Sequence, residues 1–163
     1  MPEPPQSQPD RETAGVIAPP PLIFVSILAA GLATDFLVYR MPTGLPLLPR
    51  GLVSVVLTGL AILIVLAAWL HFRRAGTPVE PWRTSTALVT DGIYGWSRNP
   101  MYLAMVLFYL AIALAVNSLV TMLFLLPLLV LLHYGVIRRE ERYLERKFGA
   151  AYRSYRQRVR RWI

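Results

Sequence analysis

Hydrophobic residues fall into three long runs along the chain. The run at 22–39 contains one charged residue, Asp35, and the run at 51–72 contains none. After a polar stretch at 73–99, the third run covers 101–137, with 37 consecutive positions that are not Asp, Glu, Lys or Arg. Apolar runs of about 18 residues or more are typical of membrane-spanning helices. The pattern therefore predicts an integral membrane protein.

The third run is too long for one crossing. A straight helix over 101–137 would be about 55 Å long, against a hydrocarbon core of about 30 Å. Asn117 and Ser118 form the polar pair within the run, and both residues favour turns and helix caps. Pro127 should kink the helix that follows the turn. We therefore expect an all-α integral membrane protein with four transmembrane helices, the third of them short.

Residues 137–162 are predicted to form a C-terminal amphipathic helix at the membrane interface. Apolar and aromatic side chains recur there at spacings of three and four, while arginines occupy the other faces. Gly149 is the position where this helix is expected to bend or break. The apolar stripe consists of Leu144, Phe148, Tyr152, Tyr155, Val159 and Trp162.

Basic residues set the expected orientation. The 73–98 link carries four arginines, and the segment from Arg138 onward carries ten Lys or Arg against three Glu. Both segments flank the hairpin of the third and fourth helices, so the positive-inside rule places them, and both termini, on the cytoplasmic side. Residues 1–21, which hold seven of the fourteen prolines among polar residues, are predicted to be a disordered cytoplasmic tail.

Composition supports the membrane assignment. The 163 residues are 55% hydrophobic and 16% charged, with a formal net charge of +8, whereas soluble domains are about 25% charged. Basicity at this hydrophobicity indicates contact with membrane lipids rather than nucleic acid. The absence of cysteine excludes disulfides and thiolate catalysis, and with only His71 and His133 no metal site is expected.

The candidate chemistry lies at the start of the third predicted helix. Asn99 is a favourable N-cap and Pro100 a favourable first helical residue. Arg98 would lie beside the positive end of that helix, which predicts a site for a carboxylate or phosphate. Gly92 would let the preceding loop approach a ligand closely. The alternative is a capped helix start with aromatic residues and an arginine at the membrane interface.

A second cluster, Arg138 to Arg142, follows the last apolar run. Its two adjacent acids, Glu140 and Glu141, could accept hydrogen bonds from a polar ligand held near Arg98. The alternative is a surface run of ion pairs, which is the usual meaning of neighbouring acids and bases on a helix.

Together these segments resemble the isoprenylcysteine carboxyl methyltransferase and phospholipid methyltransferase family of integral membrane enzymes. The resemblance covers about residues 84–163. It implies one membrane domain over 22–163, with its cofactor-binding half at 84–163. It rests on four motifs: Leu88-Val89-Thr90-x-Gly92-x-Tyr94, Arg98-x-Pro100-x-Tyr102, Glu140-Glu141-x-x-Leu144 and Phe148-Gly149-x-x-Tyr152-x-x-Tyr155.

The resemblance implies methyl transfer from S-adenosylmethionine to a lipid-soluble or lipid-anchored carboxylate or amine at the cytoplasmic membrane face. Arg98 and Glu141 are the catalytic candidates, with Glu141 as a base if the acceptor is an amine. Glu140 would accept a hydrogen bond from a cofactor hydroxyl or amine. The other residues expected to bind the cofactor are Ala87, Leu88, Val89, Gly92, Tyr94, Asn99, Pro100, Met101 and Tyr102.

Two positions depart from the eukaryotic prenylcysteine enzymes. Asn99 stands where they have histidine, and Val136 stands where they have an arginine near the substrate carboxylate. The second difference argues against a prenylcysteine acceptor. The short, arginine-rich chain is similar to bacterial members of the family, which implies the bacterial inner membrane.

Two other functions fit parts of the pattern. Sterol reductases have a similar C-terminal region but use NADPH, so an NADPH-dependent membrane reductase is one alternative. A non-catalytic four-helix membrane adaptor with a lipid-binding tail is the other, although it would not need the grouping of Tyr94, Arg98 and Tyr102.

Overall fold

The computed structural model of the chain describes residues 13–163, which are helical and contain no β-strand. Three helical stretches are long and apolar enough to cross a membrane. They are α1 (Pro20–Leu37), α2 (Leu47–Arg74) and the stretch Leu119–Arg158. A shorter apolar helix, α3 (Pro100–Ala115), lies between the last two. The all-α prediction is confirmed.

The first helix begins before the predicted boundary. α1 starts with Pro20 and Pro21, because the fixed backbone angle of proline suits the first turn of a helix. Residues 13–19 lead into it, and Ile17 N donates to Gly135 O at 3.1 Å. Within the predicted disordered tail, residues 1–12 lie outside the described part of the chain.

The predicted turn between the third and fourth helices is confirmed. α3 ends at Ala115, and Asn117 adopts a left-handed conformation with φ of 57°, which asparagine tolerates better than most residues. Ser118 Oγ then accepts a hydrogen bond from Thr121 N at 2.9 Å, so it caps α4 (Leu119–Leu123).

The final helical stretch contains three further segments. They are α5 (Leu125–Val130), the π-helix η2 (Leu131–Ile137) and α6 (Arg138–Arg158). The irregularity predicted from Pro127 appears one turn earlier, at Phe124 between α4 and α5. Proline has no N–H to donate to the carbonyl four residues before it, so the preceding turn is where the helix is weakened.

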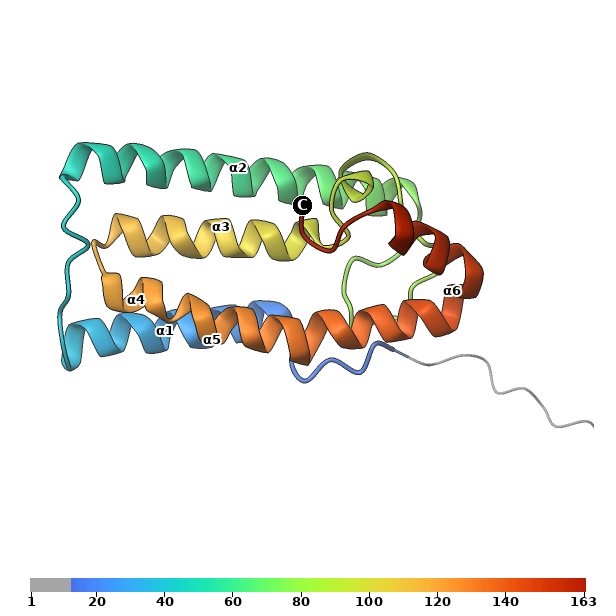
Figure 1. Cartoon of the computed structure of the whole chain (residues 1–163), viewed down its shortest axis with the longest axis horizontal. Coiled ribbons are helices and arrows are strands. Elements are labelled where there is room, and N and C mark those ends of the chain that lie inside the picture. Colours follow the sequence, from blue (N-terminus) through green and yellow to red (C-terminus); the bar gives the residue numbers. More distant parts are fainter. Residues whose placement is uncertain (1–12) are drawn as a thin grey trace, which may run out of the picture.

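The helices form two layers (Figure 1). α2 packs along α3, and α1 packs against α4, α5 and η2. Ser54 Oγ in α2 donates to Ala111 O in α3 at 2.7 Å, while buried Ala61, Ala68 and Ala104 allow the two backbones to approach closely. Phe24, Tyr109 and Leu128 join the layers in the main core.

The C-terminal helix differs from the prediction. Gly149 has φ of 52° and ψ of −119° and breaks α6, as expected. The first half continues the preceding helix, and the second half turns back over the end of the bundle (Figure 1). The apolar stripe is covered by protein, since Tyr152, Tyr155 and Val159 form a buried cluster with Leu88. The stripe therefore packs against the loop before α3 rather than against lipid, and the location of α6 at the membrane interface stays a prediction.

Candidate functional site

A cavity of about 250 Å³ lies where the starts of α1 and α3, the end of α2, the intervening loop and α6 meet. It brings together residues that are far apart in the sequence. Eleven of the twelve predicted site residues line it: Ala87, Leu88, Val89, Tyr94, Arg98, Asn99, Pro100, Met101, Tyr102, Glu140 and Glu141.

The start of α3 is left open toward a ligand. The helix begins at Pro100 as predicted, but the Asn99 side chain does not cap it. Instead, Asn99 Nδ2 donates to Arg161 O at 2.8 Å, because the C-terminal segment lies against this side chain. The predicted N-cap position is therefore confirmed, but the side-chain hydrogen bond expected of an N-cap is not made. The first-turn N–H groups of α3 lack a side-chain acceptor and carry the positive end of the helix dipole.

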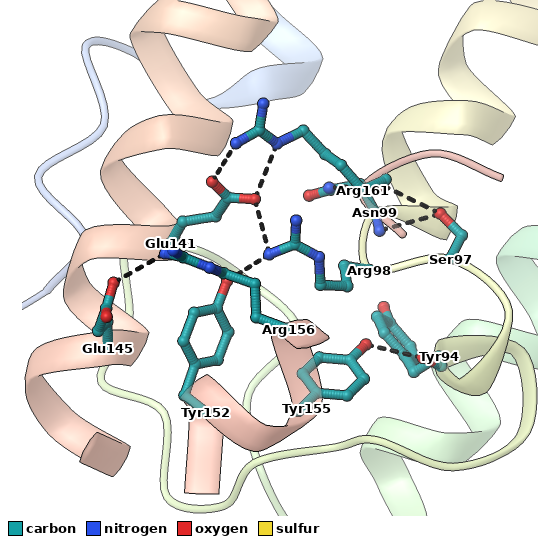
Figure 2. A network of polar contacts seen from close by, with 10 residues as sticks. All are labelled: Tyr94, Ser97, Arg98, Asn99, Glu141, Glu145, Tyr152, Tyr155, Arg156 and Arg161. Carbon is teal, nitrogen blue, oxygen red and sulfur yellow. Dashed lines mark hydrogen bonds and ion pairs between the residues drawn. The ribbon is translucent and has the colours of Figure 1, made fainter. Parts of the chain in front are cut away.

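Arg98 lies in a buried ionic network (Figure 2). Its Nη1 is 3.1 Å from Glu141 Oε1, and the Arg98 side chain is 9% exposed. Arg161 Nε and Nη2 donate to the two oxygens of Glu141 at 2.9 and 2.7 Å. Arg98 Nε is buried and has no hydrogen-bond partner. Two guanidinium groups around one carboxylate leave a net charge of +1, which suits an anionic ligand.

The same network limits what Glu141 can do. Both of its oxygens accept charge-assisted hydrogen bonds from guanidinium groups. Such bonds orient the carboxylate and occupy both of its oxygens. This arrangement argues against the predicted role of Glu141 as a base and indicates that it positions Arg98.

Glu140 has a different environment. Its Oε2 accepts a hydrogen bond from Tyr102 Oη at 2.7 Å, and in the described part of the chain no basic side chain pairs with it. Burial raises the pKa of the Glu140 carboxyl from its ordinary 4.5 to about 7; the charge of Glu141 adds to the rise, and the bond from Tyr102 opposes it. Of the two adjacent acids, Glu140 is therefore the one that can bind a cation or exchange a proton.

Replacing Glu140 with glutamine should change how stability depends on pH. Folding raises the pKa of Glu140 from 4.5 to about 7. The stability that this group contributes to the wild type is therefore full below the unfolded pKa of 4.5 and is lost as pH rises through the folded pKa of about 7. The uncharged glutamine avoids that loss. Melting temperatures of the ligand-free protein in detergent should therefore be similar near about pH 5, with Glu140→Gln melting above the wild type at about pH 8. A difference that does not vary with pH would contradict the raised pKa.

Tyr94 lies in the short 3₁₀ helix η1 (Gly92–Gly95) and forms one wall of the cavity. Its ring packs edge-on against Phe72 at 5.3 Å between centroids. Its backbone carbonyl accepts a hydrogen bond from Tyr155 Oη at 2.7 Å. Burial raises the pKa of the Tyr94 hydroxyl well above 10, so this group stays protonated.

Gly92 is the predicted site residue that does not line the cavity. It has φ of +55°, and a Cβ at this position would overlap the His71 imidazole. His71 Nδ1 is 2.7 Å from Ala67 O, which holds the ring in place. Glycine therefore serves the contact between the loop and α2, rather than the close approach to a ligand that was expected.

Several lining residues were not predicted. The loop contributes Glu80 and Trp82, the N-terminal part contributes Ala14 and Pro20, and α6 contributes Tyr143. Tyr143 Oη accepts a hydrogen bond from Ser85 N at 3.0 Å. Tyr152 and Tyr155 lie in a recognised motif, but the other residues carry no local signal, since their positions depend on contacts with distant segments.

Residues 13–163 contain no group of three or more His, Cys, Asp or Glu arranged to hold a metal ion. The sequence profile of one protein family, described as phospholipid methyltransferase, matches residues 49–151, which is more than half of the chain. An uncharacterized protein of Haemophilus influenzae is 41% identical over 63 residues, which cover 39% of this chain and all of that protein. No solved structure shows a significant match.

Proposed function

The chain belongs to the phospholipid methyltransferase family, and on this premise we propose that it transfers a methyl group from S-adenosylmethionine to a lipid-soluble or lipid-anchored acceptor at the cytoplasmic membrane face. The observation that carries the proposal is the environment of the Arg98 side chain. This side chain lines the cavity with an unpaired, buried Nε beside the open start of α3.

The residues of the cavity fit the amino-acid part of this cofactor, which carries a carboxylate and an ammonium group. Arg98 and the first N–H groups of α3 would hold the carboxylate. Glu140 lacks a basic partner in the described structure and would accept from the ammonium or a ribose hydroxyl. Leu88, Val89 and Tyr94 offer apolar and aromatic surface for the nucleoside. The opposite charges of Arg98 and Glu140 therefore match a zwitterion.

S-adenosylmethionine would supply a methyl group on a positively charged sulfur, and the chain would hold that group against the acceptor. The walls formed by Phe72, Met101 and Met105 are apolar, so they exclude water and favour a lipid-soluble acceptor. A carboxylate acceptor would require no proton transfer. An amine acceptor must lose a proton, and Glu141 is poorly suited to take it because both of its oxygens accept hydrogen bonds from arginines.

In this proposal α3 is the fourth membrane span. Its 16 residues correspond to about 24 Å of helix, which is short of a full hydrocarbon core of about 30 Å. The cavity lies beside Arg98 and the start of the arginine-rich helix α6, so the positive-inside rule favours the cytoplasmic side for the cavity and both termini. The proposed location is a bacterial inner membrane, on the resemblance to bacterial members of the family.

Titration calorimetry of the detergent-purified protein with S-adenosylhomocysteine tests this function. We expect saturable binding that Glu140→Gln weakens about tenfold, because one charged contact of about 1.4 kcal/mol is lost. Glu145→Gln is the matched control, since Glu145 lies on the same helix and pairs with Arg156 at the surface. Its affinity should equal that of the wild type.

The same titration with NADPH separates the alternatives. If the protein binds NADPH and does not bind S-adenosylhomocysteine, an NADPH-dependent membrane reductase replaces the proposed methyltransferase. If folded protein binds neither ligand, the non-catalytic membrane adaptor becomes the better explanation. Confirmed cofactor binding leads to a screen of lipid extracts with a labelled methyl donor.

A further inference from the structure

The C-terminal segment, residues 159–163, crosses the start of α3 and is fastened to it. Arg98 N donates to Arg160 O at 3.0 Å. Asn99 Nδ2 and Ser97 Oγ donate to Arg161 O at 2.8 and 3.3 Å. Trp162 packs against the main core. These contacts hold the Arg161 side chain beside α6 (Figure 2).

Arg161 forms the stronger of the two ion pairs with Glu141. Its two nitrogens donate to both carboxylate oxygens at 2.9 and 2.7 Å, whereas Arg98 reaches one oxygen at 3.1 Å. Two parallel hydrogen bonds of this kind are the preferred geometry of an arginine–carboxylate pair. The charge of Glu141 is therefore shared between the two arginines, and Arg161 makes the contact with both oxygens.

Arg161 does not line the cavity, while Arg98 and Glu141 do. Arg161 therefore influences a ligand without touching it, through its own charge and through its contact with Glu141. The three side chains carry a net charge of +1. If Arg161 were absent, Glu141 would pair with Arg98 alone, and the buried pair would have no net charge.

We propose that Arg161 is a positioning residue that holds Glu141 so that Arg98 keeps a net positive charge for the carboxylate of the cofactor. This inference rests on the proposed function and assigns the C-terminal segment to the cofactor site. Because the Arg98 side chain is 9% exposed, solvent screens its charge weakly, and the balance among the three groups governs how strongly it attracts an anion.

Two ligands with the same nucleoside and thioether test the proposal. S-adenosylhomocysteine has the amino-acid carboxylate, and 5′-methylthioadenosine lacks it. Arg161→Met should weaken binding of S-adenosylhomocysteine about tenfold and change the affinity for 5′-methylthioadenosine by less than about twofold. The matched control is Arg160→Met, because Arg160 is the exposed neighbour and its contact with Arg98 is made by the backbone.

Glu141→Gln removes the negative charge that Arg161 restrains. The double variant Arg161→Met/Glu141→Gln should therefore recover most of the affinity that Arg161→Met loses. Glutamine keeps the size and polar oxygen of the side chain. The double variant can therefore be compared with the wild type even if Arg161→Met does not fold.

The inference is overturned if Arg161→Met weakens both ligands equally, because that result indicates a purely structural role. It is also overturned if the double variant binds S-adenosylhomocysteine about tenfold more weakly than the wild type, because neutralising Glu141 would then fail to restore the affinity. Failure of the wild type to bind S-adenosylhomocysteine would instead overturn the proposed function, so the two failures are distinguishable.

Discussion

Replacing Arg98 with methionine should weaken binding of S-adenosylhomocysteine about 100-fold while the protein remains folded. Loss of a buried, charged partner of a carboxylate costs about 2–5 kcal/mol, and about 1.4 kcal/mol corresponds to a factor of ten. Arg98 is the cavity-lining arginine in the described structure. Its removal does not leave Glu141 without a partner, because Arg161 still donates to both carboxylate oxygens.

The matched control is Arg83→Met. Arg83 lies in the same loop, and its side chain is exposed and lies outside the cavity, so its loss should leave the affinity unchanged. Calorimetry measures binding, and circular dichroism in the same detergent checks that each variant is folded. Unchanged binding by folded Arg98→Met would show that the carboxylate of the ligand is held elsewhere.

Replacing Gly92 with alanine should destabilise the protein by about 2–3 kcal/mol. A left-handed conformation costs an alanine about 1–2 kcal/mol. The new Cβ would also overlap the His71 ring, and moving that ring sacrifices the hydrogen bond to Ala67 O, which is worth about 1 kcal/mol. Thermal unfolding in detergent measures the change.

Two variants separate these causes. Gly76 has φ of +61° and open space where a Cβ would lie, so Gly76→Ala should show the backbone cost alone, about 1–2 kcal/mol. Adding His71→Ala to Gly92→Ala should remove the overlap, so the paired substitutions should cost less than the sum of the two single ones. Equal effects of Gly92→Ala and Gly76→Ala would show that His71 does not constrain this position.

Much of the fold is encoded locally. The apolar runs identify α1, α2 and the last helical stretch, because a membrane span requires nearly continuous apolar sequence. Asn99-Pro100 marks the start of α3, and Asn117-Ser118 marks the turn that ends it, because these residue types favour turns and helix starts through their own backbone and side-chain geometry. Gly149 marks the break in α6 for the same reason.

The grouping of residues at the cavity could also be anticipated, because the motifs around Tyr94, Arg98 and Glu140 resemble one family. The individual contacts of these residues could not be predicted from the sequence. The apolar stripe of α6 shows only that one face is covered, and the choice between lipid and protein depends on where the loop before α3 lies. Gly92 likewise signals a close approach, but it does not reveal that the neighbour is His71.

The ionic partners at the site depend entirely on the folded chain. The Asn99 side chain donates to Arg161 O, 62 positions away, instead of accepting a capping hydrogen bond at the start of α3. Glu141 accepts hydrogen bonds from Arg161 of the C-terminal segment. A side chain selects its partner by distance and burial, which arise only when separate helices pack together. Local patterns therefore identify the spans, the turns and the candidate residues, while the assembled bundle decides which of those residues line the cavity and brings Arg161 to Glu141.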